Sequence, residues 1–262
     1  MTLLGVSELS RSFEGVTALK DVTFDVAAGG VHAIIGPNGA GKTTLFNLVT
    51  GLHRPTRGRV LLGDADVTGA RPSSMAARGL SRTFQNLQIF FNMSALENVM
   101  VGAHLHSDRR LSSSLFRLRG LGRGERAAAD RARALMAEVG LDAYAGAAAA
   151  AMPYGALKRL EIARALASRP KLLLLDEPAA GLNLAETAAI GYLIRKIAAS
   201  GVTVLLVEHN MRLVMEISDR VLVLDRGQLL ADGTAAEVRA DPQVVRAYLG
   251  TRADTAKESR RA

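Results

Sequence analysis

The sequence predicts an α/β fold, in which helices cover both faces of a mostly parallel β-sheet. Short apolar runs alternate with helical stretches over much of the chain, and this alternation leads to right-handed crossovers between parallel strands. One apolar run leads directly into a glycine-rich turn and a helix. The chain has 262 residues and is 48% hydrophobic, so it can bury a sizeable core.

The N-terminal third is expected to be mainly β and to begin with an antiparallel β subdomain. Apolar residues over 3–30 are spaced as in strands, and over 22–26 they alternate with polar residues. Three further elements are expected: an apolar strand at 31–36, a helix from about 42 to 50, and a strand pair or hairpin over 59–67.

The middle of the chain, about 86–156, is predicted to be a mainly helical insertion. The stretches 94–105 and 125–140 are rich in Ala, Leu, Arg and Glu, which favour helices. Residues 107–124 between them end in three closely spaced glycines and are predicted to form a flexible loop. The small, low-complexity segment 145–152 fits either a helix end or a packed linker.

The α/β alternation returns after the insertion. The expected elements are helix 157–168, strand 172–176, helix 184–200, strand 202–208, helix 211–217, strand 220–225 and a C-terminal helix over about 235–250. The polar tail 251–262 is predicted to be disordered. Residues 1–250 are therefore predicted to form one domain.

Composition narrows the functional class. The chain has no Cys, which excludes disulfides and thiolate metal sites and fits a reducing cytoplasm. No apolar run approaches the roughly 18–20 residues that cross a bilayer, and no signal peptide is expected. The net charge of +8 fits nucleic-acid binding, a position against an anionic membrane surface, or a solvated Arg-rich surface. No nucleic-acid-binding motif supports the first of these.

Residues 36–43, GPNGAGKT, fit the phosphate-loop pattern G-x-x-x-x-G-K-[ST] in its required context after a strand and before a helix. Glycines let backbone N–H groups converge on phosphate oxygens at the positive end of the helix. Lys42 is expected to reach the β- and γ-phosphates and Thr43 to bind Mg²⁺. The alternative is a glycine-rich turn with a chance lysine. The expected cofactor-binding residues here are Gly36, Pro37, Asn38, Gly39, Ala40, Gly41, Lys42, Thr43 and Thr44.

An apolar strand at 172–175 ends in two carboxylates, Asp176 and Glu177. Ligands of parallel sheets bind at the carboxyl ends of the strands. Asp176 is expected to hold Mg²⁺, and Glu177 to polarise an attacking water. The alternative is a strand that merely ends in an acidic turn. Together the two motifs predict a P-loop NTPase that uses ATP and Mg²⁺.

Over residues 4–250 the chain resembles the ATP-binding subunits of ABC transporters. The resemblance implies a RecA-like core of about 1–85 and 157–235, interrupted by the helical insertion, and ATP hydrolysis by a dimer. It implies that Gln85, in RTFQN, links the Mg²⁺ site to the membrane subunits and takes part in catalysis. It implies that His209, in VEHN, is the switch histidine that senses the γ-phosphate.

Other expected contacts rest on the same resemblance. Phe13 corresponds to the aromatic residue that stacks on adenine, although a lone Phe in a strand is usually a core residue. Residues 180–183 correspond to the dimer-contact loop, and 153–166 to the family signature and its helix, with Gly155 binding nucleotide. His104 and His106 have a metal-like spacing but no third ligand nearby, and are interpreted as solvated.

A narrower resemblance is to the ATPase of branched-chain amino acid importers. It rests on five segments: 91–104, 154–164, 176–183, 207–220 and 244–250. Import of urea or related amides, export of lipid or polysaccharide, and a non-transport ABC ATPase acting on ribosomes or DNA are the alternatives. The resemblance implies a second ATPase subunit, two transmembrane permease subunits and, indirectly, a substrate-binding protein, with no nucleic acid. A heterodimer is expected and a homodimer is the alternative. The expected location is peripheral, on the cytoplasmic face of the inner membrane.

The chain departs from the usual family signature, Leu-Ser-Gly-Gly-Gln. The aligned residues run from Met152 to Ala156, with Pro153 in the place of the serine. Proline has neither a hydroxyl nor an N–H to offer a γ-phosphate. Asn183 also replaces the usual aspartate of the dimer-contact loop. These departures predict that the nucleotide site served by this signature is weaker than one served by the usual signature.

Overall fold

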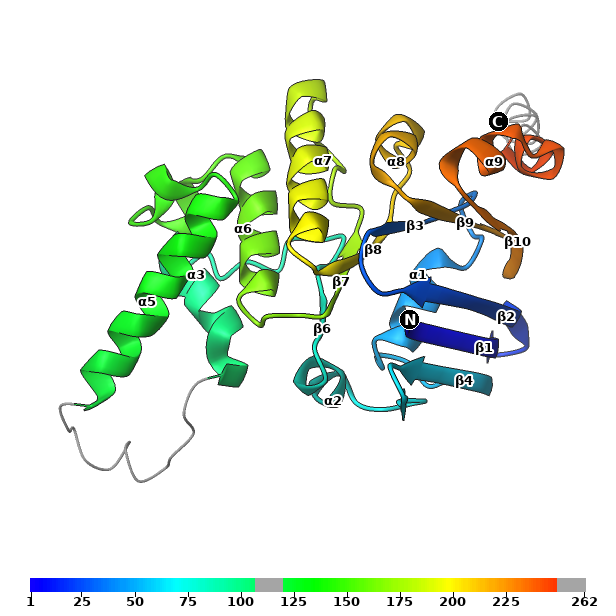
Figure 1. Ribbon diagram of the computed structural model, residues 1–262, viewed down its shortest axis with the longest axis horizontal. Helices are drawn as coiled ribbons and strands as arrows, with labels where there is room; N and C mark the ends of the chain where they lie inside the picture. Colours follow the sequence, from blue (N-terminus) through cyan, green and yellow to red (C-terminus); the bar gives the residue numbers. More distant parts are fainter. Residues whose placement is uncertain (107–119, 249–262) are drawn as a thin grey trace.

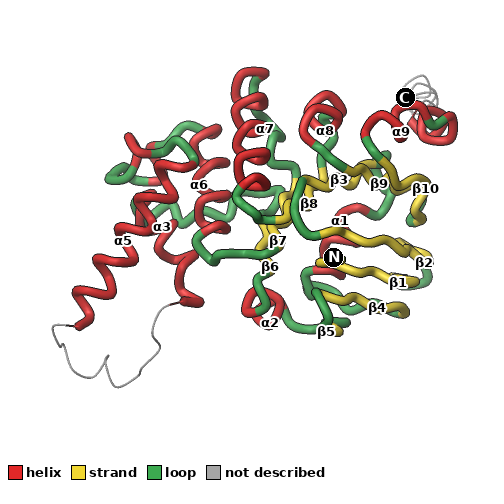
Figure 2. The backbone as a smooth tube through the Cα atoms, in the orientation of Figure 1, coloured by secondary structure: helices red, strands yellow, loops and turns green. Residues whose placement is uncertain are grey.

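The structure is a computed structural model that describes residues 1–106 and 120–248. It contains a six-stranded sheet, ordered β10-β9-β3-β8-β7-β6, and a four-stranded sheet, ordered β2-β1-β4-β5 (Figure 1). Helices α3, α5 and α6 gather at one end of the molecule and the four-stranded sheet lies at the other (Figure 2). No helix within these described ranges is long and apolar enough to cross a membrane.

The four-stranded sheet is antiparallel, as the sequence predicts for the N-terminal residues. It contains β1 (Thr2–Phe13), β2 (Val16–Ala27), β4 (Arg57–Leu62) and β5 (Ala65–Asp66). β1 lies between β2 and β4 and is antiparallel to both. The hairpin expected over 59–67 is the β4–β5 pair.

The six-stranded sheet is parallel except at one edge. It contains β3 (Val31–Ile35), β6 (Leu80–Arg82), β7 (Leu172–Asp176), β8 (Thr203–Val207), β9 (Arg220–Asp225) and β10 (Gln228–Gly233). β3 is parallel to both β8 and β9, and β7 is parallel to both β8 and β6. Only β10 is antiparallel to its neighbour. The α/β class with a mostly parallel sheet is therefore confirmed.

The helices follow the order expected from the sequence, except that α2 was not predicted. They are α1 (Lys42–Val49), α2 (Pro72–Ala77), α3 (Ala95–Gly102), α5 (Gly120–Glu138), α6 (Tyr154–Leu166), α7 (Leu184–Ala199), α8 (Met211–Ile217) and α9 (Ala235–Ala240). Short 3₁₀ turns lie at Ala103–His106, Asp142–Tyr144 and Ala149–Ala151. Residues 242–248 are also helical.

Two apolar cores lie on opposite faces of the six-stranded sheet, because side chains alternate along a strand. Ile34 of β3 packs with α1 and the four-stranded sheet, whereas its neighbours Ala33 and Ile35 pack with α6, α7 and α8. Helix α1 is thus enclosed between the two sheets, where Phe46 is fully buried. This packing fixes the turn between β3 and α1.

Several sequence predictions differ from the structure. The loop expected through residue 124 is helical from Gly120, because glycine costs a helix only about 1 kcal/mol and does not forbid it. The C-terminal helix expected over 235–250 is interrupted at Asp241, since the following Pro242 disfavours the helical conformation of the residue before it. Residues 107–119 of the expected loop, and the tail predicted to be disordered, lie outside the described residues.

The segment 145–152, left open between a helix end and a packed linker, is a packed linker. It contains a 3₁₀ turn, and Ala149 is fully buried. Its backbone pairs with the segment before α3 through an isolated bridge between Ser94 and Ala148. The following helix α6 begins at Tyr154, three residues before the position expected from the sequence.

Candidate functional site

The phosphate loop connects β3 to α1, and its glycines are required by its shape. Gly36 has a φ of 153°, and a Cβ there would collide with the carbonyl oxygen of Leu224. Gly41 has a φ of 99°, and a Cβ there would lie 2.6 Å from Leu19 Cδ2. Gly41 is also the N-cap of α1, where no side chain accepts a hydrogen bond from the first turn. The loop thus leaves the N–H groups of the α1 N-terminus available to an anion.

Lys42 is buried, with 6% of its surface exposed, although it is a charged residue. Its Nζ donates hydrogen bonds to Gly36 O at 2.7 Å and to Pro37 O at 3.0 Å. Burial lowers the pKa of the Lys42 ammonium, and the charge of Glu177 partly opposes that effect. The ammonium is therefore folded onto the phosphate loop.

A cavity of about 640 Å³ contains most of the site residues predicted from the sequence. It is lined by Ala18, Asn38, Gly39, Ala40, Gly41, Lys42, Thr43, Thr44, Gln85, Glu177 and His209. The phosphate loop, Gln85, Glu177 and His209 follow or end β3, β6, β7 and β8, whose carboxyl ends meet at one edge of the sheet.

Glu177 is held by side chains at both carboxylate oxygens. His209 Nε2 lies 3.0 Å from its Oε1, and Gln85 Nε2 donates to its Oε2 at 3.1 Å. Its backbone has a φ of 50°, and its N–H donates to Val207 O of the neighbouring strand at 2.9 Å. A non-glycine residue at positive φ is uncommon and clusters at functional sites. The three residues expected to be catalytic thus lie in contact.

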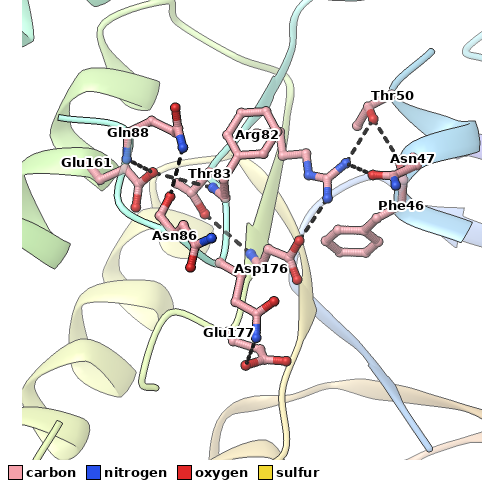
Figure 3. A network of polar contacts seen from close by, with 12 residues as sticks. Phe46, Asn47, Thr50, Arg82, Thr83, Asn86, Gln88, Glu161, Asp176 and Glu177 are labelled. Carbon is pink, nitrogen blue, oxygen red and sulfur yellow. Dashed lines mark hydrogen bonds and ion pairs between the residues drawn. The ribbon is translucent and has the colours of Figure 1, made fainter. Parts of the chain in front are cut away.

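Asp176, one residue earlier, does not line the cavity. It is buried, with 4% exposed, and its Oδ2 lies 2.8 Å from Arg82 Nη2 (Figure 3). Its N–H donates to the Thr83 hydroxyl at 3.3 Å. Arg82 was not predicted from the sequence, although it lies three residues before Gln85 at the end of β6.

Three further charged residues were missed and support the same edge of the sheet. Lys158 Nζ lies 3.4 Å from Gln85 O and 3.5 Å from Glu177 O, so α6 contacts both loops. Glu208, 3% exposed, accepts N–H bonds from Ala179, His209 and Asn210. Glu161 accepts from Phe84 N and Gln88 N. Glu208 could have been found from the sequence, because it is an acidic residue directly before the predicted site residue His209.

Four predicted nucleotide contacts do not line the cavity: Gly36 and Pro37, at the start of the phosphate loop, and the more distant Phe13 and Gly155. The Phe13 ring packs edge-on against His53 at 5.5 Å and lies 4.4 Å from the Arg11 guanidinium carbon. Gly155 is buried at the start of α6, where a Cβ would lie 2.6 Å from Glu186 Oε1 of α7. Neither Phe13 nor Gly155 lines the cavity that contains the phosphate loop.

The oxygen donors at this edge fit a hard cation such as Mg²⁺. Thr43 offers a hydroxyl in the cavity, Gln85 an amide oxygen, and Asp176 a carboxylate just behind it. Within the described residues, no three His, Cys, Asp or Glu side chains are grouped to hold a metal ion. Magnesium does not need such a group, since one or two carboxylates and substrate phosphates commonly bind it.

Known proteins resemble the chain over nearly its whole length. The model of the ABC transporter family matches residues 19–180, and that of the branched-chain amino acid ATP-binding cassette transporter matches 228–254. The high-affinity branched-chain amino acid transport ATP-binding proteins BraF of Pseudomonas aeruginosa and LivG of Escherichia coli K12 are 44% and 41% identical. Each match covers 95% of this chain and 98% of the relative.

A more distant relative is named for a different transport process. The lipopolysaccharide export system ATP-binding protein LptB of Acidithiobacillus ferridurans is 36% identical over 95% of this chain and 97% of its own. Among solved structures, a nucleotide-free ATP-binding cassette from an ABC transporter has a TM-score of 0.83 and 32% identity. The ADP conformation of the cassette MJ1267 has a TM-score of 0.82 and 31% identity. Both structural matches cover 95% of this chain and 99% of the other.

Proposed function

Because the chain belongs to the ABC transporter family of ATP-binding cassettes, we propose that it drives the import of branched-chain amino acids. It is an ATPase with the P-loop NTPase fold. The observation that carries the hydrolytic part of the proposal is one cavity that brings the phosphate loop to Gln85, Glu177 and His209. In the proposed complex the loop binds the phosphates of a nucleoside triphosphate, and the three side chains line the same cavity as the loop.

The proposed roles follow from the contacts. Lys42 and the N–H groups of the loop bind phosphate oxygens, because the helix N-terminus and the ammonium both carry positive charge. Thr43, Asp176 and Gln85 hold Mg²⁺, which when bound neutralises charge on the phosphates. Glu177 orients and polarises the attacking water, and His209 positions that carboxylate through its Nε2 contact.

Replacing Glu177 tests the hydrolytic assignment. Glu177→Gln keeps the shape and the contact to Gln85, so nucleotide binding is expected to survive while turnover falls roughly 10²–10⁴-fold. Lys42→Ala is the matched comparison and is expected to weaken nucleotide binding itself. Binding and phosphate release are measured with the assembled transporter. Near-normal turnover of the Gln variant contradicts the assignment.

The transported substrate is proposed from the relatives, since the two named for branched-chain amino acids are 41–44% identical and the lipopolysaccharide export relative is 36% identical. Uptake of radiolabelled leucine is the test, in cells from which this gene has been deleted. The wild-type chain is expected to restore uptake and Glu177→Gln to leave it low. Restored urea uptake or lipid export, with leucine uptake unaffected by the deletion, contradicts the proposal.

The proposed partners are a second ATPase subunit, two transmembrane permeases and, through them, a substrate-binding protein. This places the chain peripherally on the cytoplasmic face of the inner membrane. A groove of about 460 Å³ beside Gln85 supports permease docking, because it is lined in part by Phe90 and Val101, which are 44% and 40% exposed. Phe84 and Phe91 are exposed in the same stretch, at 36% and 49%. Large apolar side chains gathered at a surface are typical of an interaction site.

Cross-linking tests the docking surface, and the natural chain has no Cys to interfere. Cysteines at the exposed positions Gln88, Phe90 and Asn92 are expected to capture a permease subunit in the assembled transporter. A cysteine at Val16, 71% exposed at the start of β2, is the control and is expected to capture none. Failure at all three positions in a working complex contradicts docking here.

A further inference from the structure

A buried ion pair lies directly behind the cavity. Arg82 Nη2 contacts Asp176 Oδ2 at 2.8 Å, and only 7% and 6% of the two side chains are exposed. The residues are far apart in sequence and are brought together because β6 pairs in parallel with β7. A carboxylate at this depth is costly unless a cation compensates it.

Arg82 is itself fixed from several directions (Figure 3). Its Nη1 donates to Asn47 Oδ1 at 2.7 Å and to Thr50 Oγ1 at 3.1 Å, both at the end of α1. Its guanidinium carbon lies 5.4 Å from the Phe46 ring centre and 5.0 Å from that of Phe84. The guanidinium therefore joins the helix that follows the phosphate loop to the strand that carries Asp176.

Lys42, the lysine of the phosphate loop, does not form an ion pair with Asp176. Lys42 Nζ is hydrogen-bonded to Gly36 O and Pro37 O, and the carboxylate whose charge acts on it is Glu177. Among the cationic side chains that the structure describes, Arg82 is the one in an ion pair with Asp176. The charge balance of Asp176 without a metal thus depends on Arg82.

We propose that Arg82 is a positioning residue that compensates Asp176 while Mg²⁺ is absent, and that it thereby weakens the binding of Mg²⁺ with nucleotide. This rests on the proposed role of Asp176 as a Mg²⁺ ligand. Two cations that share one carboxylate repel each other, and each lowers the affinity of the other by the same factor. Arg82 stabilises the protein when Mg²⁺ is absent, and it keeps the binding of Mg²⁺ reversible.

The test is a Mg²⁺ titration of Arg82→Met in the full chain with ADP, followed by a fluorescent nucleotide and by thermal unfolding. Methionine is unbranched and apolar, so it keeps a side chain that can pack near the Phe46 and Phe84 rings, and it removes the charge. The half-saturating Mg²⁺ concentration is expected to fall about tenfold or more, because the metal now relieves an uncompensated buried carboxylate. The Mg²⁺-free protein is expected to unfold at a lower temperature than the wild type.

Two matched variants separate charge from structure. Thr50→Val removes one hydrogen bond to Arg82 but leaves the ion pair, so it is expected to lower the unfolding temperature and leave the Mg²⁺ midpoint within about twofold. Arg82→Lys keeps the charge and is expected to keep a midpoint near that of the wild type. An unchanged or raised midpoint in Arg82→Met overturns the proposal.

The remaining outcomes are also decisive. If Arg82→Met does not fold, the double variant Arg82→Met/Asp176→Asn is expected to fold, since it no longer buries an unpaired charge. Failure of the double variant as well overturns the proposal, because packing of Arg82 on the two rings then explains the loss. If nucleotide binding by the wild type does not depend on Mg²⁺, the metal assignment in the proposed function fails and the Arg82 proposal falls with it.

Discussion

Glu161 lies buried in α6 beneath the loop that carries Gln85, with 3% of its surface exposed. Its Oε1 accepts N–H bonds from Phe84 and Gln88, both at 3.4 Å, which is long for a charge-assisted bond. Burial raises the pKa of the Glu161 carboxyl, and the two N–H bonds together with the charges of Lys158 and Arg164 oppose that effect. The ionised side chain therefore orders the loop at a cost in stability.

Replacing Glu161 with glutamine is expected to change how stability depends on pH. The pKa of Glu161 is raised in the folded state, so its contribution to stability is greatest below the ordinary value of 4.5 and is lost as pH rises through the raised value. Glutamine does not ionise and keeps an amide oxygen for the two N–H donors. The unfolding temperature of Glu161→Gln relative to wild type is thus expected to rise with pH above about 4.5.

Thermal unfolding of both proteins across a pH series measures this difference. Glu216→Gln, the same chemical change at an exposed position of α8, controls for the change in net charge. A difference between Glu161→Gln and wild type that stays constant with pH contradicts the assignment of the burial cost to Glu161.

Helix α7 begins with a capping box that also ends the loop after Glu177. The Asn183 side chain accepts from Glu186 N at 3.0 Å, and Glu186 Oε2 accepts from Asn183 N at 3.0 Å. Each bond satisfies a backbone N–H that the first turn of the helix leaves unpaired. Asn183 was predicted as part of a dimer-contact loop; within the chain its side chain caps α7.

Removing the cap is expected to destabilise the protein. Asn183→Ala is expected to lower the free energy of unfolding by about 0.5–2 kcal/mol, whereas Asn183→Asp keeps the acceptor and is expected to stay close to wild type. Urea denaturation of the isolated chain measures both. An equal decrease in the free energy of unfolding of both variants shows that the Asn183 side chain does not act through the helix cap.

The elements that the sequence predicted well are those with strong local patterns. Strands β3, β7 and β8 are short apolar runs that end at a glycine or a carboxylate, and all three are fully buried. β6 was missed because three residues are too few to show a period, and its pairing with β7 defines it. The pattern of β10 was also missed, because most of its residues are only partly buried at a sheet edge.

The site residues were predictable where one short motif contains several of them. They were not predictable where a contact joins side chains from distant segments. The phosphate loop and the strand end at Glu177 were found locally, and the cavity brings them together. The contact of Arg82 with Asp176 spans 94 residues and that of Lys158 with Gln85 spans 73. Nothing in the local sequence around Arg82 or Lys158 distinguishes them from solvated surface cations.

The phosphate loop and the start of the signature segment do not line the same cavity. The cavity is lined by the loop and the carboxyl ends of the parallel strands, and it includes no residue from the start of α6. Pro153 and Tyr154 at that start are exposed, and Pro153 is an N-cap without a side-chain hydrogen bond. Exposure of this segment supports the proposal that it serves a nucleotide bound by a second ATPase subunit.

The departure at Pro153 predicts that the working dimer is asymmetric. A proline offers no hydroxyl to the partner's nucleotide, and losing one bond to a charged phosphate costs roughly 1.5–3 kcal/mol. A homodimer has this loss in both sites, whereas a heterodimer with the usual signature on the other subunit has it in one. Weak ATPase activity is therefore expected from the isolated chain, and much more from the assembled transporter.

Restoring the hydroxyl is the direct test. Ala156 is 1% exposed, so glutamine there would disturb the core and Pro153→Ser alone is the better variant. It is expected to raise ATP turnover of the isolated chain about tenfold or more and to change the heterodimer less. Pro153→Ala is the control, because it restores the N–H without the hydroxyl. If the isolated wild-type chain already hydrolyses ATP as fast as the assembled transporter, the signature does not slow ATP hydrolysis. A different partner subunit is then not needed.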